Sequence, residues 1–325
     1  MPARRTIGVD MGGTKLLAGA VDASLSVHHR TQRLLTGLDQ SALLDITVDA
    51  VQEIREAGGP DIDAVGFGIP SLIDQRSGTA VVAVNLPLAD IAFGDVMAER
   101  LGLPVFVDND GNMAAIAEHQ AGAAQGCTEV LMLTIGTGIG GGLILRNRPY
   151  RGSVGSAAEL GHLVIDMNGP PCQGNCPNRG CIEAMASGTA LAREALRLAQ
   201  ERPGSGLARA LADGQPIVGP LVTELAHDGD EAALEAIELI GTRLGVALTS
   251  LTNIFNPQVI VIGGGVIAAG ELLLAPARRV VAERALPPSR EEVRIVAARF
   301  GVEAGMIGAA ALAFSEFDKR SAEAA

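Results

Sequence analysis

Aromatic residues are scarce in this chain of 325 residues: they make up 2% of it, with a single tyrosine, Tyr150, and no tryptophan. Aliphatic side chains must therefore fill the interior, because apolar residues still account for 48% of the sequence. Such a composition suits a parallel or mixed sheet covered by helices. The length exceeds the size at which a single hydrophobic core usually stops growing, so we expect two domains.

An excess of positive charge is also lacking. The formal net charge is −12 at pH 7, and a polyanion would be repelled over most of such a surface. We therefore expect a small-molecule partner and neither nucleic acid nor membrane. No uncharged apolar stretch approaches the length that spans a membrane, and the N-terminal residues lead into an expected strand rather than a signal-peptide core. These features predict a cytoplasmic protein.

Cysteine is rare, but three of the four cysteines lie close together in the sequence. Cys127 stands alone, whereas Cys172, Cys176 and Cys181 follow one another within ten residues and come shortly after His162. In a reducing compartment this spacing favours a metal over disulfides, and the glycines and prolines between the cysteines permit sharp turns. Three thiolates and an imidazole suit a closed, structural Zn²⁺ site, in which no position is left for a reacting water. The alternative is a group of buried thiols.

Glycine is abundant, and one glycine stretch raises a specific question. Gly136, Gly138 and Gly141 form a G-x-G-x-x-G pattern after an apolar run, as in a dinucleotide-binding fingerprint. That fingerprint requires a helix after its last glycine, yet three apolar residues and a polar turn ending in Pro149 follow. The spacing therefore predicts two strands joined by a glycine turn, which can still bind phosphate through successive N–H groups. A nicotinamide oxidoreductase is correspondingly disfavoured.

The N-terminus repeats this arrangement. Residues 6–10 and 16–21 are predicted strands, and the turn between them contains Gly12, Gly13, Thr14 and Lys15. Two such units indicate a duplicated domain, with each half presenting a turn to a cleft. The turn lacks the spacing of a Walker A loop. Asp10, at the end of the first strand, is suited to Mg²⁺ directly or through water.

Polar residues gather where another predicted strand, 105–107, ends. Asn109, Asp110 and Asn112 precede a predicted helix, 113–121, and an N-cap with a turn would account for only one of them. The surplus favours a carboxylate that acts as a base and an amide that holds a hydroxyl. Glu159 and Glu183 flank the predicted metal ligands. Each could be a solvated surface group, or a rigid acceptor for the hydroxyls of a polyol.

The remaining pattern predicts helices alternating with strands. Ser41 is the expected N-cap of the first helix, and 203–220, rich in glycine and proline, is expected to be a loop or a connection between helices. The expected helices are 41–57, 188–200, 230–255, 272–285 and a C-terminal helix from Glu303, and the expected strands are 64–69 and 259–262.

Taken together, the motifs resemble those of the ROK family (repressors, open reading frames, kinases) along nearly the whole chain. The matching stretches are Gly8-Val9-Asp10-x-Gly12-Gly13-Thr14-Lys15, Gly66-x-Gly68-x-Pro70, Asn109-Asp110-x-Asn112, Gly136-Thr137-Gly138-Ile139-Gly140-Gly141-Gly142, Glu159-x-Gly161-His162, Gly180-Cys181-x-Glu183 and Ile262-Gly263-Gly264-Gly265. The resemblance implies an α/β, actin/hexokinase-like (ribonuclease H-like) fold, with duplicated domains flanking an ATP/sugar cleft. It implies a small domain of residues 1–117 plus 303–325 and a large domain, 118–302, with a zinc-binding loop.

The resemblance also implies an activity: ATP-dependent phosphorylation of a hexose, most often glucose to glucose 6-phosphate as in glycolysis, with Mg²⁺ and a structural Zn²⁺. Asp110 would be the general base. The sugar would contact Gly68, Asn85, Asn109, Asp110, Glu159, His162 and Glu183. The nucleotide would contact Asp10 (through Mg²⁺), Gly12, Gly13, Thr14 and Lys15, then Thr137 and Gly138, with Gly264 and Gly265 at the adenosine. The metal ligands would be His162, Cys172, Cys176 and Cys181.

Four positions depart from the family pattern. Gly111 stands where alanine is common, Ala158 stands where glycine is common, three residues rather than one separate Cys172 from Cys176, and no tryptophan accompanies Asn85. The cysteine spacing leaves open which of Cys172 and Cys176 aligns with which family ligand.

Other readings within the family also stay open. The acceptor could be mannose, fructose, N-acetylmannosamine or N-acetylglucosamine, and polyphosphate is a less favoured donor. A sugar-sensing repressor would need a helix-turn-helix domain before the first glycine turn, where only seven residues precede Gly8. The resemblance suggests a homodimer or homotetramer.

Overall fold

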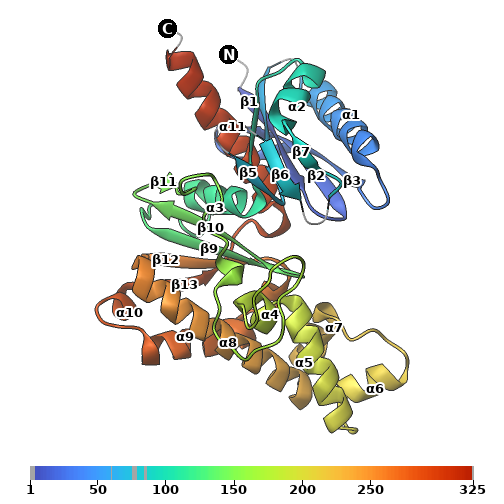
Figure 1. Ribbon diagram of the computed structural model, residues 1–325, viewed down its shortest axis with the longest axis vertical. Coiled ribbons are helices and arrows are strands. Elements are labelled where there is room, and N and C mark those ends of the chain that lie inside the picture. The colour runs from blue at the N-terminus through green and yellow to red at the C-terminus, as the bar shows by residue number, and fades with distance from the viewer. Residues whose placement is uncertain (1–3, 60, 75–78, 84–85, 324–325) are drawn as a thin grey trace. The chain divides into compact units, whose positions relative to one another are not determined.

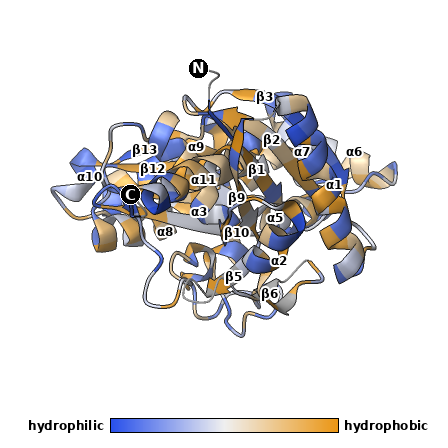
Figure 2. Cartoon of the chain, turned by 90° about the horizontal axis from the view of Figure 1, so that it is seen from above, coloured by the Kyte–Doolittle hydropathy of each residue, from blue (hydrophilic) through white to orange (hydrophobic). Residues whose placement is uncertain are grey.

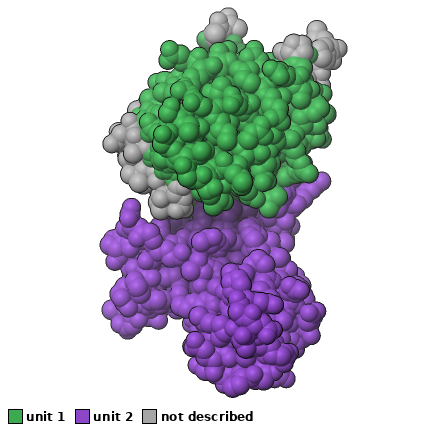
Figure 3. Space-filling view, turned by 90° about the vertical axis from the view of Figure 1, so that its right-hand side faces the viewer, with its two compact units in different colours: residues 1–126, 142–158, 302–325 green, residues 127–141, 159–301 purple. Residues whose placement is uncertain are grey.

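The computed structural model describes residues 4–59, 61–74, 79–83 and 86–323, which form two compact units (Figure 3). Unit 1 comprises Met1–Gly126, Gly142–Ala158 and Val302–Ala325, and unit 2 comprises Cys127–Gly141 and Glu159–Gly301. These bounds differ from the expected division at 117/118. The helix that contains residue 118 runs unbroken from Asp110 to Ala121, and a Cβ added to Gly142 would lie 2.6 Å from the Ala115 side chain. The unbroken helix accounts for the residues that follow 117 in unit 1, and the packing of Gly142 against Ala115 accounts for the return of the chain to unit 1 at 142–158.

Unit 1 is built on a mixed five-stranded sheet of order β3-β2-β1-β4-β8, of which Figure 1 labels β1, β2 and β3. The hairpin of β1 (Arg5–Met11) and β2 (Lys15–Asp22) is the predicted strand–turn–strand unit, and β3 (Val27–Leu34) extends it antiparallel. On the other side of β1, strands β4 (Ile62–Ile69) and β8 (Val105–Asn109) run parallel to it. A smaller sheet holds β5 (Ser71–Asp74), β6 (Thr79–Ala83) and β7 (Ala89–Ile91).

The two faces of this sheet pack differently because successive residues of a strand point to opposite sides. Ile7 and Val9 join the apolar core that includes residues of α1 (Gln40–Gly58) and α2 (Phe93–Leu101). Gly8 faces α11 (Ala304–Glu323), which also packs on α3 (Asp110–Ala121). The α1 helix carries both hydrophobic and hydrophilic residues, as Figure 2 shows, so one of its sides can be buried while the other meets solvent.

A second sheet has the order β11-β10-β9-β12-β13, and the division between the units falls within β10. The pair β9 (Val130–Ile135) and β10 (Ile139–Leu145), joined by a glycine turn, confirms the second predicted hairpin; β11 is Arg148–Pro149. The strand β12 (Val259–Gly263) is fully buried and runs parallel to β9 and to β13 (Arg294–Ala297). Since β10 is a strand, no helix follows the G-x-G-x-x-G pattern.

Helices make up most of the rest of unit 2. They are α4 (Ile182–Ala186), α5 (Gly188–Glu201), α6 (Gly206–Ala212), α7 (Gly219–His227), α8 (Glu231–Phe255), α9 (Glu271–Arg284) and α10 (Ser289–Glu292). The long, apolar α8 packs against α9, α5 and α7. Among the described residues, no helix combines the length and apolar character needed to cross a membrane.

Local hydrogen bonding corrects two sequence expectations. The first helix is capped by Asp39 rather than Ser41, because the Asp39 side chain accepts a 2.9 Å hydrogen bond from the Ala42 N–H. The segment 203–220, expected to be a loop or connection, contains α6 and the start of α7, and Ser205 caps α6 by accepting from the Ala208 N–H.

Candidate active site

Asp110 is the first residue of α3 and follows β8 directly. The helix was expected to begin at Met113, but Asn109 caps it earlier: the Asn109 side chain accepts from the Gly111 N–H at 2.9 Å, and Asp110 accepts from the same N–H at 2.9 Å. Burial raises the pKa of the Asp110 carboxyl, against the lowering effect of the Gly111 donor. The result is a carboxylate in a fixed position with an increased affinity for a proton.

Asp108, two residues before it, is buried and fully engaged. Its carboxylate accepts from the Asn109 N–H at 2.7 Å, from Nδ2 of Asn112 at 2.9 Å and from Nε of Arg151 at 2.5 Å. Only 1% of its side chain is exposed, so a cation must compensate its charge. The sequence analysis did not identify Arg151. The signal that could have indicated such a partner is Asp108 itself, because a carboxylate at the end of an apolar strand needs a cation to pair with.

Asp10 lies at the end of β1 in the same unit. Burial, together with the negative charge of Asp110, raises the pKa of Asp10 to about 7, against the opposing charge of Lys15. Asp10, Gly12 and Lys15 line a hollow of about 370 Å³, and the turn is closed by a 2.8 Å hydrogen bond from the Gly12 N–H to the Lys15 carbonyl. Unit 1 thus brings together two predicted carboxylates and the first glycine turn.

The residues of this hollow that the sequence did not mark as site residues include Arg30 on β3 and Glu303, which form an ion pair. Arg30 belongs to a strand of mostly exposed polar residues, so its sequence context carried no signal. Gly13 and Thr14 lie in the turn itself, with Thr14 exposed.

Unit 2 holds the second glycine turn, Gly136–Gly138. The Gly136 N–H donates to the Gly138 carbonyl at 2.9 Å, which closes the turn tightly. Glu183, near the start of α4, accepts from the Ile139 N–H at 2.8 Å, and a Cβ added to Gly138 would lie 2.3 Å from the same Glu183 oxygen. One oxygen of this predicted sugar-binding carboxylate is therefore engaged by the turn.

His162, Cys172, Cys176 and Cys181 form a cluster whose ligand atoms all lie within 4.8 Å of one another; we call it the metal cluster. A tetrahedral zinc site places two thiolate sulfurs about 3.8 Å apart, and a sulfur and an imidazole nitrogen about 3.6 Å apart. The separation between Cys176 Sγ and Cys181 Sγ is 3.9 Å, and that between Cys172 Sγ and His162 Nδ1 is 3.6 Å. The residues therefore fit a tetrahedral cation.

The metal cluster also bears on the neighbouring carboxylates. With Nδ1 of His162 beside the cysteines, its Nε2 lies 3.9 Å from the exposed Glu159 carboxylate. Burial raises the pKa of the Cys172 thiol, as do the neighbouring thiols. The thiolates that bind a metal are therefore favoured only when a cation compensates their charge.

The other predicted residues are more dispersed. Gly68 lies in β4 beside Met113, whose Cγ would lie 2.8 Å from an added Cβ. Gly264 has a φ of +84° and packs on the carbonyl of Ile135, next to Gly265 at the start of a short 3₁₀ helix. Asn85 lies outside the described residues.

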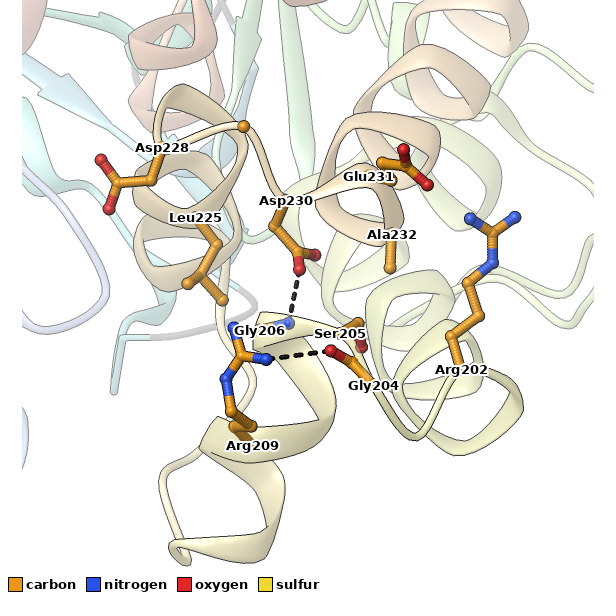
Figure 4. Close-up of a pocket in the computed structure, with 11 residues that line it drawn as sticks. Arg202, Gly204, Ser205, Gly206, Arg209, Leu225, Asp228, Asp230, Glu231 and Ala232 are labelled. Atoms are coloured by element: carbon orange, nitrogen blue, oxygen red, sulfur yellow. Dashed lines mark hydrogen bonds between the residues drawn. The ribbon is translucent and has the colours of Figure 1, made fainter.

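A second hollow, of about 590 Å³, lies in unit 2 around the starts of α6 and α8 (Figure 4). None of the predicted site residues lines it. Its polar groups bond to one another: Asp230 accepts from the Gly206 N–H, and Arg209 donates to the Gly204 carbonyl at 2.9 Å. The hollow is therefore separate from the candidate site.

The two mixed sheets and the paired hairpins define an α/β protein with the actin/hexokinase-like fold. A ROK family glucokinase from Streptomyces griseus, solved with glucose and AMPPNP, has the same architecture: the TM-score is 0.85 at 35% identity, covering 96% of this chain and 99% of that one. The chain belongs to the ROK family, whose model matches residues 6–316.

Curated relatives include both enzymes and regulators. A glucokinase of Streptomyces coelicolor is 35% identical over 312 residues, which is 95% of this chain and 97% of the relative. A xylose repressor of Bacillus spizizenii is 29% identical over 316 residues, which is 96% of this chain but 77% of the repressor. Membership of the family therefore leaves the choice between a sugar kinase and a sugar-responsive regulator to the chemistry of the site.

Proposed function

We propose that the chain is an ATP-dependent hexose kinase that converts glucose to glucose 6-phosphate. The observation that carries the proposal is Asp110, a carboxylate with a raised pKa held at the start of α3 near Asp10 and the first glycine turn. The glucokinase relatives support glucose as the acceptor and ATP as the donor. Polyphosphate is the less favoured donor.

Asp110 acts as the general base. It accepts the proton of the sugar hydroxyl as the hydroxyl oxygen attacks the γ-phosphorus, while the bond from the γ-phosphorus to the bridging oxygen breaks and ADP leaves. Its raised pKa makes it a better proton acceptor near neutral pH. The Asn109 cap fixes the backbone from which Asp110 projects. The positive charge of Arg151 compensates the negative charge of Asp108, the buried carboxylate two residues before the base. Correct placement of the acceptor accounts for much of the barrier reduction in phosphoryl transfer.

The phosphates of ATP require positive charge and N–H donors. The proposed donors are Lys15 and the turn with Gly12, Gly13 and Thr14, together with Thr137 and Gly138, and Gly264 and Gly265 are proposed for the adenosine. Asp10 fits Mg²⁺, because its buried carboxylate lies in the field of a second carboxylate and would be stabilised by a cation. Bound Mg²⁺ would neutralise phosphate charge.

The sugar hydroxyls require fixed hydrogen-bond partners. The proposed partners are Asn109, Glu159, His162 and Glu183, with Gly68 permitting close approach. The metal cluster would hold a structural Zn²⁺ that fixes the orientation of the His162 ring through Nδ1 and leaves Nε2 toward the Glu159 side.

The deciding experiment measures ADP production with Mg²⁺–ATP over free hexoses, amino sugars and N-acetyl sugars. We expect one hexose to be strongly preferred. Replacing Asp110 with asparagine should lower turnover by about a thousandfold or more while sugar binding persists, since the amide cannot accept the proton. Near-normal turnover of the Asp110→Asn variant would refute the base assignment.

The regulator relatives define the second candidate, a sugar sensor without turnover. It predicts sugar binding, measured by calorimetry, with no ADP formed from any acceptor in the panel. If mannose, fructose or an N-acetyl sugar were strongly preferred, the kinase assignment would stand and that sugar would replace glucose as the proposed substrate.

A further inference from the structure

The carbonyl oxygens of the second glycine turn are all engaged by protein donors. The Gly136 carbonyl accepts from the Gly188 N–H at 2.8 Å, and the Gly138 carbonyl accepts from the Gly136 N–H at 2.9 Å. The Thr137 carbonyl accepts from Oγ1 of Thr189 at 2.8 Å and from Nε2 of Gln173 at 3.4 Å. This concentration of donors lies at the start of α5 and in the cysteine-bearing segment.

These contacts determine where the N–H groups of the turn point. A peptide unit is planar and trans, so its C=O and N–H point in opposite directions. Holding the Gly136 carbonyl therefore aims the Thr137 N–H away from Gly188, and holding the Thr137 carbonyl aims the Gly138 N–H away from Thr189 and Gln173. A flipped peptide would present a carbonyl dipole to a phosphate where the anion needs a donor.

The donors are themselves held by the metal cluster and by α5. Gln173 directly follows the ligand Cys172, and its side-chain amide also donates to Oγ of Ser187, the N-cap residue of α5, at 3.2 Å. Its carbonyl accepts from the Cys176 N–H at 3.4 Å. Gly188 fits because a Cβ there would lie 2.7 Å from the Gly136 carbonyl oxygen. The position of Gln173 thus depends on the loop that the cysteines close.

We propose that Gln173 and Thr189 are positioning residues of the nucleotide site, which couple the metal cluster to the glycine turn by fixing the peptide orientation of Thr137–Gly138. The inference rests on the proposed assignment of that turn to the phosphates of ATP. A metal at the cluster then serves nucleotide binding as well as the fold of its own loop.

The test uses the double variant Gln173→Ala/Thr189→Val in the full chain. Thr189→Val removes the hydroxyl but keeps the side-chain shape, and Gln215→Ala, an exposed glutamine of the same unit, is the matched control. Loss of both side-chain hydrogen bonds to the Thr137 carbonyl should raise the KM for ATP about tenfold and leave the KM for sugar within about twofold. The variant Gln173→Ala/Thr189→Ser, which keeps the hydroxyl at position 189, should reverse part of the rise in the KM for ATP that Gln173→Ala/Thr189→Val causes.

A second readout is independent of catalysis. Amide hydrogen exchange of a peptide covering 134–140 should speed up in the double variant and also after the metal is removed with a chelator, whereas a peptide covering α7 should be unchanged in the double variant. If no sugar is phosphorylated, the proposed function fails, but the exchange measurement still decides the coupling. The proposed coupling would be overturned by unchanged hydrogen exchange at 134–140, or by a rise in the KM for sugar as large as the rise in the KM for ATP.

Discussion

Asp10 is a carboxylate whose ionisation opposes the folded state. Its pKa of about 7 lies above the ordinary value because of burial and the nearby charge of Asp110. A carboxyl with a raised folded-state pKa binds its proton more tightly in the folded protein, so its contribution to stability is fully present below about pH 4 and is lost as the pH rises through about 7. A cation bound beside the ionised carboxylate would offset this cost.

Asp10→Asn should therefore stabilise the protein in a pH-dependent way. In the absence of Mg²⁺ and nucleotide, we expect the variant to raise Tm by about 2–4 °C at pH 8 and by much less at pH 4.5. The measurement is thermal unfolding across this range, with Asp49→Asn, an exposed aspartate on α1, as control. A difference in Tm that does not vary with pH would contradict the ionisation argument.

Ala158 is strained by its backbone conformation. Its φ is +71°, in the left-handed region where a Cβ is unfavourable, and it stands where the ROK pattern commonly has glycine. Ala158→Gly should remove the strain and raise the free energy of unfolding by about 1 kcal/mol. Chemical denaturation would measure it, with Ala157→Gly as control, since Ala157 has no positive φ. Equal effects of the two substitutions would show that strain at Ala158 is not the cause.

At the scale of elements, the packing of α11 on the unit 1 sheet depends on glycine. A Cβ at Gly8 would lie 1.9 Å from the Met306 carbonyl oxygen, and one at Gly66 would lie 1.8 Å from that of Ala309. No rotamer change relieves such a clash, because the obstructing atoms belong to the backbone. The helix and the sheet can approach this closely only because β1 and β4 both present glycine there.

Gly66→Ala should therefore destabilise unit 1 by about 3 kcal/mol or more, at the upper end of the cost of overpacking. The control is Gly94→Ala, where an added Cβ meets only an ordinary 3.5 Å contact with Val107. Urea denaturation followed by circular dichroism measures both. A Gly66→Ala protein as stable as the control would mean that α11 can move away without cost.

The elements themselves could largely be predicted, because their signals are local. The apolar residues after Gly141 exclude a dinucleotide-binding helix, and β10 confirms this exclusion. The ends of the helices were harder to predict. Asp39 and Ser41 are both good N-cap residues, and only the hydrogen bond to Ala42 decides between them. In 203–220, the glycines and prolines concealed α6, whose start is fixed by the Ser205 cap.

At the scale of the whole molecule, the sequence could supply candidate residues but not their partners. The metal cluster was predictable because thiol spacing is a direct chemical signal, and its four ligands do lie together. Arg151, Gln173 and Thr189 were not, since each donates a hydrogen bond to a residue distant in the sequence. Long-range pairing of this kind depends on the folded path of the chain, which a motif does not encode.

The metal cluster leads to the final prediction, which concerns the stability of the molecule. Elemental analysis should find about one zinc ion per chain, and Cys176→Ser should lose most of it and lower Tm, because the binding free energy of a structural metal contributes to folding. Cys127→Ser is the matched control: Cys127 is a buried cysteine of the same unit outside the metal cluster, so its variant should keep the zinc. If a metal-free preparation had the same Tm as the zinc-bound protein, the metal would have no structural role, and the three thiols in one glycine-rich segment would need another explanation.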